Sequence, residues 1–348
     1  MSSREWMERA LFLAMRGRGK TSPNPMVGAV IVKDGQVIGE GFHAAAGGPH
    51  AEIEALRMAG ERARDSEIYV TLEPCSHFGK TPPCTDALLK AGIQKVTAAM
   101  IDPNPALNGR GIEILKKTGI ETEVGLLENE ARKLNEIFIK WITTRLPFVT
   151  LKAAISLDGK MVTLPGQSHW ITSEESRQKG REMRSWHDAI LVGIKTILKD
   201  DPMLTTRIPS ARNPIRIVLD SSARTPVNAE AIRTQAVAPT WIVTTGKNKN
   251  RETALQKAGA SVIRLPEKDG KVDLHALCNY LAEKNVTSVL VEGGAEVHRS
   301  FLKSGLVDKV AYFIAPKIFG DGVAPVLQLQ EVQVTQIGED ILIEGKKV

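Results

Sequence analysis

The sequence has only three cysteines in 348 residues, too few and too unevenly spaced for the disulfide framework of a secreted protein. It has no long apolar run, and its first twenty residues, which include acidic side chains, read as an amphipathic helix rather than a signal peptide or membrane span. It also has no dense Lys/Arg run with interleaved aromatics, although its net charge is +6. These absences predict a cytoplasmic protein without nucleic-acid or membrane partners. The mild basic excess suits either solubility or a small substrate that carries phosphate.

The length predicts two domains, and the pattern changes near Arg145-Leu146-Pro147, which divides the chain into residues 1–145 and 146–348. The first part alternates strands and helices. Its first feature is a hairpin whose Asp34-Gly35 turn favours the type I′ conformation. We expect strands at 26–33, 36–42, 68–72 and 95–101, and helices at 50–64, 85–91, 109–118 and 127–144.

The second part has continuous apolar runs, typical of strands that are buried on both faces, with helical patterns between them. These runs are 148–156, 188–193, 215–220, 240–245, 288–292 and 309–314, and Asp158-Gly159 is expected to form a turn. Both parts are therefore of the α/β class. No Gly-x-Gly-x-x-Gly follows any of these strands, so a simple Rossmann fingerprint is absent. Gly293-Gly294 could let the backbone approach a cofactor at Gly294, although an ordinary strand-to-helix turn is the commoner explanation.

One group of residues in the first part indicates chemistry. His50 and Glu52 are followed by Cys75 and Cys84, each cysteine directly after a proline. A catalytic zinc site needs three protein ligands and an open position, and a nearby carboxylate that is not a ligand can move protons. We expect His50 at the start of one helix and Cys84 just before the next, where free N–H groups favour thiolate. This is the zinc deaminase pattern, in which activated water displaces an amino group from a ring carbon.

Each of these residues alone is more often structural, because single cysteines are usually small buried hydrophobes and single histidines are usually packing or surface residues. The combination carries the inference, since two of the three cysteines fall in this short window. One feature departs from the usual Pro-Cys-x-x-Cys spacing: eight residues separate Cys75 from Cys84.

The whole chain resembles the bifunctional deaminase–reductase family of riboflavin biosynthesis, which shows this longer spacing. The matching segments of the first part are 21–28, 47–52, 71–77, 79–84 and 102–105. Those of the second part are 152–160, 168–172, 200–205 and 291–294. The resemblance implies a cytidine-deaminase-like three-layer domain followed by a domain similar to dihydrofolate reductase.

The resemblance also implies two successive reactions. The first domain would deaminate 2,5-diamino-6-ribosylamino-4(3H)-pyrimidinone 5′-phosphate with Zn²⁺. The second would reduce the ribosyl group to ribityl with NADPH and form 5-amino-6-ribitylamino-uracil 5′-phosphate. The partner is thus a phosphorylated pyrimidine, and a homo-oligomer is expected.

Residue roles carry over to matching positions. The zinc ligands would be His50, Cys75 and Cys84, with Glu52 as general acid and base; deaminase substrate contacts would be Asn24, His77, Lys80, Asp102 and Asn104. Reductase cofactor contacts would be Ala154, Trp170, Thr196, Asp200 and Ser222, together with Gly294 from the glycine turn; its substrate contacts would be Ser168, Arg184, Leu204, Arg207 and Glu292.

Some of these roles also make physical sense without the resemblance. Arg184 and Arg207 could grip phosphate through the guanidinium fork, and His77 and Lys80 are donors on a glycine-containing loop. Considered alone, Arg184 would be a solvated helix residue, the His77–Lys80 loop a solvated loop, and Trp170 a core aromatic.

Three other classes compete with this interpretation. A nucleic-acid or free-nucleoside deaminase would share the zinc residues but would not need the second part. A binding protein on this fold would be expected to lose Glu52 or a ligand, and none is lost. A single-activity protein with a decayed reductase part is the third alternative, and oxidation of NADPH with the deaminated intermediate distinguishes it.

Overall fold

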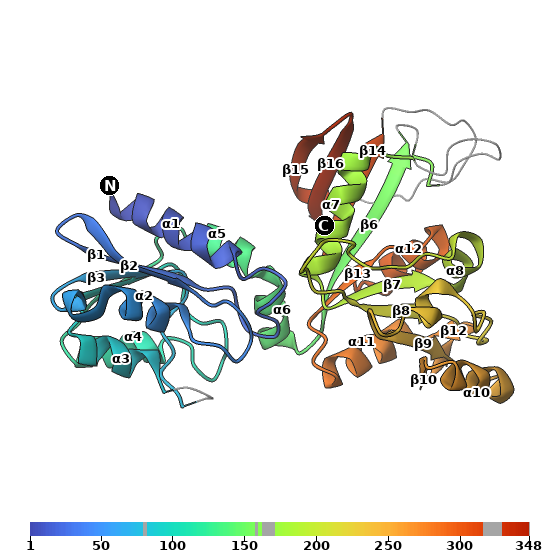
Figure 1. Cartoon of the computed structure of the whole chain (residues 1–348), viewed down its shortest axis with the longest axis horizontal. Coiled ribbons are helices and arrows are strands. Elements are labelled where there is room, and N and C mark those ends of the chain that lie inside the picture. The colour runs from blue at the N-terminus through green and yellow to red at the C-terminus, as the bar shows by residue number, and fades with distance from the viewer. Residues whose placement is uncertain (79–81, 157–158, 162–170, 316–328, 348) are drawn as a thin grey trace. The chain divides into compact units, whose positions relative to one another are not determined.

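The structure is a computed structural model that describes residues 1–347 except 79–81, 157–158, 162–170 and 316–328 (Figure 1). The chain divides into two compact units, Met1–Arg145 and Leu146–Val348. Within the described part of the chain, no helix is long and apolar enough to cross a membrane.

Unit 1 contains one five-stranded sheet. Its strands are β1 (Gly28–Lys33), β2 (Gln36–Phe42), β3 (Glu67–Val70), β4 (Lys95–Ala98) and β5 (Glu121–Val124). They lie in the order β2-β1-β3-β4-β5, with β1 antiparallel to both neighbours and β3, β4 and β5 parallel to one another. The predicted hairpin is confirmed, and Asp34 and Gly35 both have positive φ, as a type I′ turn requires.

Helices cover both faces of this sheet and make the predicted three layers (Figure 1). One face packs against α1 (Ser3–Met15), α5 (Glu128–Leu134) and α6 (Glu136–Thr144). The other packs against α2 (Ala51–Ala59), α3 (Cys84–Ala91) and α4 (Arg110–Lys117), and a 3₁₀ turn, η1 (Gly60–Ala63), follows α2.

Helix α2 lies unusually close to β2 because glycine and alanine face each other across the contact. A Cβ atom on Gly41 would lie 2.2 Å from the Ala51 carbonyl oxygen, and one on Gly39 would lie 2.3 Å from that of Ala55. Real Cβ atoms do not approach so closely, so these strand glycines allow the backbones to meet. The start of α2, where the predicted metal ligand His50 lies, is thereby fixed against the sheet.

Unit 2 contains a nine-stranded sheet in the order β10-β9-β8-β7-β13-β6-β14-β16-β15. The first seven strands in this order are parallel, and β16 and β15 add an antiparallel edge. The strands are β6 (Phe148–Ser156), β7 (Ala189–Gly193), β8 (Ile215–Leu219), β9 (Thr240–Thr244), β10 (Ser261–Arg264), β13 (Ser288–Val291), β14 (Lys309–Ala315), β15 (Leu329–Ile337) and β16 (Asp340–Lys347); β11 (Glu267–Lys268) and β12 (Lys271–Val272) form a separate small hairpin.

The parallel strands β7, β8 and β13 are buried on both faces, as their continuous apolar runs predicted, whereas β10 at the edge of the sheet is mostly exposed. Ile190 and Val192 of β7 pack on the side of α8 (Ile194–Asp200), α9 (Glu230–Arg233) and α10 (Lys249–Lys257). Leu191 packs on the opposite side with α11 (Leu274–Glu283) and α12 (Ala295–Ser304). Helix α7 (Glu174–Trp186) covers β14 and β16 through Met183.

The α/β prediction is confirmed in both units, but several elements differ from expectation. The helix expected over 127–144 is two helices that meet at Asn135, whose side chain hydrogen-bonds both backbone groups of Met26. The helix expected over 50–64 ends at Ala59, because Gly60 takes a positive φ and η1 follows. The polar strands β5, β10, β15 and β16 were not predicted. Asp158 of the expected turn lies outside the described residues.

Candidate active sites

Three potential metal ligands meet in unit 1. His50 directly precedes α2, Cys75 follows β3, and Cys84 is the first residue of α3, not the residue before it as expected. The Nδ1 atom of His50 lies 3.3 Å from Cys84 Sγ and 3.4 Å from Cys75 Sγ, and the three ligand atoms lie within 4.8 Å of one another. Zinc bonds of about 2.0–2.3 Å in a tetrahedron separate ligands by roughly 3.5–3.8 Å, so this donor set fits zinc.

The protonation of the cluster follows from its crowding. A hydrogen bond from the Cys84 thiol lowers the pKa of Cys75 to about 4, and the nearby imidazole of His50 acts in the same direction. The same hydrogen bond, together with burial, raises the pKa of Cys84. The three groups therefore share protons in a small volume. A divalent cation that displaced these protons would be bound by both sulfurs as thiolates.

Glu52 lies in the first turn of α2 and is only 3 % exposed. Burial, reinforced by the charge of Cys75, raises the pKa of its carboxyl group to about 7. A carboxyl group with this pKa can both release and take up a proton near neutral pH, as a general acid and base must.

Asn24 is connected to the cluster through His43, a residue that the sequence did not indicate. The His43 ring lies edge-on to His50, with centroids 5.6 Å apart. Its Nδ1 is 2.9 Å from the Pro49 carbonyl oxygen and its Nε2 is 3.1 Å from the Asn24 amide nitrogen. With Nδ1–H as donor, Nε2 accepts from Asn24, and burial lowers the pKa of His43, which favours this neutral form.

The other predicted substrate contacts of unit 1 lie on two loops near the cluster. Asp102 is buried, which raises the pKa of its carboxyl group, and the charges of Cys75 and His77 also act on it. The backbone N–H of Asn104 donates to Asp102 Oδ1 at 2.8 Å. The side chain of His77 is exposed. Lys80 lies outside the described residues.

In unit 2 the predicted cofactor contacts follow the carboxyl ends of neighbouring parallel strands. Thr196 and Asp200 belong to α8 after β7, Ser222 follows β8, and Gly294 precedes α12 after β13. The strand order β8-β7-β13-β6 brings these segments to one edge of the sheet, where open α/β sheets bind ligands. Ala154 lies in the carboxyl half of β6. Trp170 and Ser168 lie outside the described residues.

A buried ion pair lies at this edge. Arg184 of α7 donates through Nε and Nη2 to the two carboxylate oxygens of Glu292, at 2.8 and 2.9 Å, and through Nη1 to the Thr205 carbonyl oxygen at 3.0 Å. Lys152 Nζ is 3.6 Å from Glu292 Oε2. Burial would raise the pKa of Glu292, but Arg184 and Lys152 outweigh it and lower the pKa to about 2.

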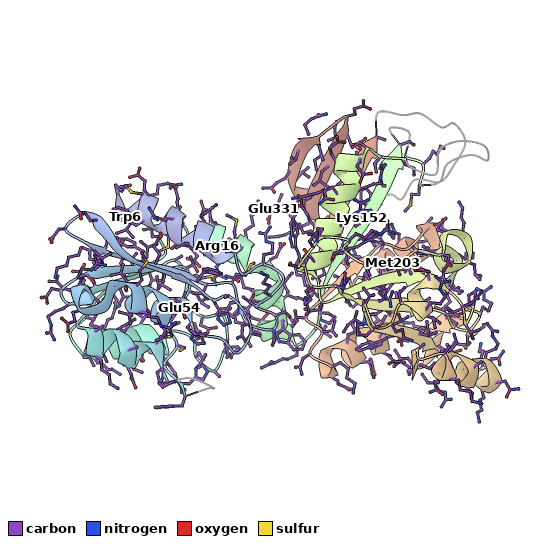
Figure 2. All side chains as sticks on the ribbon, viewed as in Figure 1. Trp6, Arg16, Glu54, Lys152, Met203 and Glu331 are labelled. Carbon is purple, nitrogen blue, oxygen red and sulfur yellow. The ribbon has the colours of Figure 1, made fainter. Side chains whose placement is uncertain are left out.

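Lys152 is the first residue of the matching segment 152–160, and the sequence predicts no role for it. It belongs to β6, its side chain is 17 % exposed, and its ammonium group lies 5.5 Å from the centroid of the Phe313 ring (Figure 2). The feature of the sequence that could have indicated a role for Lys152 is its place inside an otherwise apolar strand. Such a residue needs a partner when it points inward, and the sequence did not identify Glu292 as that partner.

The segment that contains Leu204 and Arg207 is held in an unusual conformation. Both residues have φ values in the left-handed region, 56° and 53°. Arg216 of β8 is fully buried and donates to the Met203 carbonyl oxygen at 3.1 Å and to Thr234 Oγ1 at 2.7 Å (Figure 2 labels Met203). Burial lowers the pKa of Arg216 to about 10. Leu204 is buried, whereas Arg207 is exposed and has no ion-pair or hydrogen-bond partner for its guanidinium among the described residues.

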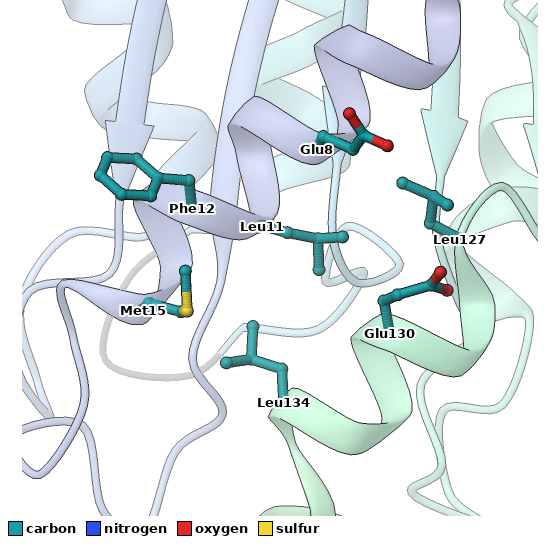
Figure 3. A pocket seen from close by; sticks show the side chains of 7 residues that line it. All are labelled: Glu8, Leu11, Phe12, Met15, Leu127, Glu130 and Leu134. Carbon is teal, nitrogen blue, oxygen red and sulfur yellow. The ribbon is translucent and has the colours of Figure 1, made fainter. Parts of the chain in front are cut away.

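A groove of about 290 Å³ in unit 1 lies apart from these residues (Figure 3). It runs between α1 and α5, on the face of the sheet opposite α2 and α3. Its lining consists of Glu8, Leu11, Phe12, Met15, Leu127, Glu130 and Leu134, none of which is a predicted site residue.

Two family models match the chain, one within each of its two compact units. Residues 1–100 match the cytidine and deoxycytidylate deaminase zinc-binding region, and residues 147–343 match the RibD C-terminal domain. These matches and the His-Cys-Cys cluster define the class of the protein: an enzyme that joins a zinc-type deaminase domain to a reductase domain.

Relatives match the chain from end to end. The riboflavin biosynthesis protein RibD of Aquifex aeolicus is 45 % identical, with 99 % of this chain and 94 % of the relative covered. RibD of Escherichia coli is 43 % identical, with 92 % and 89 % covered. The solved structure of Acinetobacter baumannii RibD is 38 % identical with a TM-score of 0.86, and 99 % of this chain and 98 % of that one are covered.

A structure from Thermotoga maritima has the same coverage and TM-score at 37 % identity, and is described as a diaminohydroxyphosphoribosylaminopyrimidine deaminase and 5-amino-6-(5-phosphoribosylamino)uracil reductase. The chain belongs to the RibD family and is a bifunctional deaminase and reductase of riboflavin biosynthesis.

Proposed function

We propose that residues 1–145 carry out the deamination and residues 146–348 the reduction. The family matches at 1–100 and 147–343 fall within these two ranges. Each range also has its own hydrophobic cores and its own cluster of buried titratable groups. Two sites in two units favour two separable activities.

The substrate of the first reaction is 2,5-diamino-6-ribosylamino-4(3H)-pyrimidinone 5′-phosphate. The oxygen of water replaces the amino group on a ring carbon, and ammonia leaves. The reductase then converts the ribosyl group of the deaminated product to ribityl and forms 5-amino-6-ribitylamino-uracil 5′-phosphate. The activities named for the Thermotoga maritima relative support this assignment.

The observation that carries the deaminase proposal is the cluster of His50, Cys75 and Cys84 beside the buried Glu52. These three residues would hold zinc, which would supply the Lewis acidity that activates water at neutral pH. The Glu52 carboxylate takes a proton from the attacking water and delivers it to the leaving amino nitrogen. Its burial and its pKa of about 7 suit both steps.

The remaining polar groups around the cluster bind the substrate. Asn24, oriented by His43, and the Asp102–Asn104 loop offer amide and carboxyl groups to the pyrimidine edge. His77, exposed beside the cluster, and Lys80 are assigned to the 5′-phosphate.

In the reductase the cofactor is NADPH, which supplies the hydride. Its contacts would be Ala154, Thr196, Asp200, Ser222 and Gly294, on segments that meet at this edge of the sheet, and the resemblance adds Trp170 to them. Glu292 and Leu204 would contact the sugar of the substrate, and Lys152 would complement negative charge that develops on the sugar oxygen. The resemblance assigns Ser168 to the substrate as well. Arg184 is already engaged by Glu292 and Thr205, so the exposed Arg207 is the better placed of the two arginines to grip phosphate.

The test uses the whole purified chain. We expect about one zinc per chain, ammonia release from the diaminopyrimidinone, and NADPH oxidation with the deaminated product. Glu52→Gln should keep its zinc but lose roughly 10²–10⁴-fold in deaminase rate, because the amide cannot carry the proton. Near-normal ammonia release by this variant would refute the role of Glu52. The expected homo-oligomer stays a prediction, which light scattering on the same sample tests.

A further inference from the structure

Glu73 is a buried carboxylate that the proposed mechanism does not use. It lies three residues beyond the end of β3 and is 5 % exposed. Its two oxygens accept four backbone N–H groups, all from one distant segment: Asp102 at 2.9 Å and Gly109 at 3.0 Å to Oε2, and Gly111 at 2.7 Å and Ile112 at 3.3 Å to Oε1. A carboxylate has about four acceptor positions, so its capacity is fully used.

The segment that Glu73 holds has no cap of its own. Helix α4 begins after Gly109, which has a φ of +87° and offers no side chain to the first free N–H groups. Glu73 satisfies these groups from outside the helix. The fit is close, because a Cβ on Gly111 would lie 2.1 Å from the Pro74 carbonyl oxygen.

The same contacts connect the metal cluster to a loop with a proposed substrate role. Glu73 precedes the cluster residue Cys75 by two positions, and its own N–H donates to the Met100 carbonyl oxygen at 2.9 Å. At the other end, Glu73 accepts from Asp102, whose carboxylate accepts from Asn104. The backbone and side chain of Glu73 thus connect the segment that carries Cys75 to the Asp102–Asn104 loop.

We propose that Glu73 is a positioning residue of the deaminase site, which holds Asp102 and Asn104 in place relative to the cluster. The proposal rests on the deaminase function proposed above. It predicts that loss of the carboxylate displaces the loop while the three metal ligands remain in place, because the hydrogen bonds of the Glu73 side chain among the described residues all go to residues 102–112.

Glu73→Gln is the informative change because it keeps the size of the side chain. Its amide has one acceptor oxygen, and its NH₂ group would face N–H donors, so part of the set of four hydrogen bonds must break. A displacement of about 1 Å in a positioning group can lower a rate roughly 10²-fold, and we expect a loss of that order in deaminase kcat/KM. Glu113→Gln is the matched control, since Glu113 belongs to α4, the helix that Glu73 caps, but its side chain is exposed.

Three further readouts separate positioning from general damage. Zinc content and reductase activity of Glu73→Gln should match those of the wild type. Hydrogen exchange should accelerate at the amides of residues 102–112 and not elsewhere in unit 1. In the Glu73→Gln background, Asp102→Asn should lower activity much less than it does in the wild type, because residues acting through one another are not additive.

Each result decides the proposal. Unchanged exchange at residues 102–112, additive effects of the two substitutions, or zinc loss in step with activity would each overturn it. A wild-type chain that binds zinc but releases no ammonia would instead refute the proposed function. The exchange measurement would still decide whether Glu73 positions the loop.

Discussion

Replacing Glu292 by Gln should destabilise unit 2 strongly, because the change removes the negative charge that is paired with the cations of Arg184 and Lys152 in a buried cluster. The Glu292 side chain is 9 % exposed, that of Arg184 19 % and that of Lys152 17 %. The shape of the side chain is kept, whereas Arg184 loses a charged two-pronged partner. Breaking one partner of a buried pair typically costs about 3–5 kcal/mol.

A second argument gives a similar magnitude. The cluster lowers the pKa of Glu292 from its ordinary value of 4.5 to about 2. Each pKa unit corresponds to about 1.4 kcal/mol, so the ionised carboxylate contributes roughly 3 kcal/mol to folding near neutral pH. Because the folded-state pKa is the lower one, this contribution is complete above pH 4.5 and is lost as the pH falls towards 2. In a unit of about 200 residues, such a loss lowers Tm by roughly 6–12 °C.

The assay is scanning calorimetry of the whole chain at neutral pH, with the deaminase transition as internal reference. Glu296→Gln is the matched control. The pKa of Glu296 is also lowered to about 2, by Lys195 and Lys271, but its side chain is 46 % exposed. Solvent screens such a pair, so we expect a shift of less than about 1 kcal/mol that vanishes in high salt.

Equal shifts for the two variants would refute this reasoning, and so would a loss at Glu292 that salt abolishes. The difference between wild type and Glu292→Gln should also shrink as the pH falls below 4.5. A difference that stays constant over that range would show that charge is not its source.

Three further predictions follow from single contacts. Cys75→Ala should lose zinc and ammonia release but still oxidise NADPH with the deaminated product; a folded variant that fails both assays would contradict two separate sites. Arg207→Ala should raise the reductase KM by roughly 10-fold or more with less effect on kcat, because it removes a charged contact of about 1.5–3 kcal/mol. Loss of NADPH binding with a normal substrate KM would instead place this arginine on the cofactor. Gly41→Ala should destabilise unit 1 by about 1–3 kcal/mol in chemical denaturation, since its Cβ would lie 2.2 Å from the Ala51 carbonyl oxygen. Gly35→Ala is the control: a Cβ there would meet open space, so this change tests only the backbone strain of a positive φ.

The sequence by itself determined the class of the fold and pointed to the three side chains that the structure brings together as potential metal ligands. Strands buried on both faces leave continuous apolar runs, and the hairpin turn leaves an Asp-Gly pair, so both are visible locally. The cluster was equally visible because its chemistry needs particular residue types. Imidazole and thiolate ligands at His50, Cys75 and Cys84 cannot be exchanged for other side chains without loss of a zinc site.

Polar edge strands were not predictable in the same way. β5 has no buried side chain, and β15 has none among those described. Val332 and Val334 of β15 alternate with polar residues but are exposed, so no buried apolar face marks either strand. Their conformation is decided by pairing with a neighbouring strand, β4 for β5 and β16 for β15, and not by an apolar face of their own.

Only the tertiary structure decided which polar residues act together. More than thirty residues separate Glu73 from the start of α4, and more than one hundred separate Arg184 from Glu292. A lone carboxylate in a sequence gives no sign of whether it will face water, four backbone amides or a guanidinium. Because the energy of a charged group depends on burial and on partners brought close by the fold, the roles of Glu73, Lys152 and Arg216 could be assigned only once their neighbours were known.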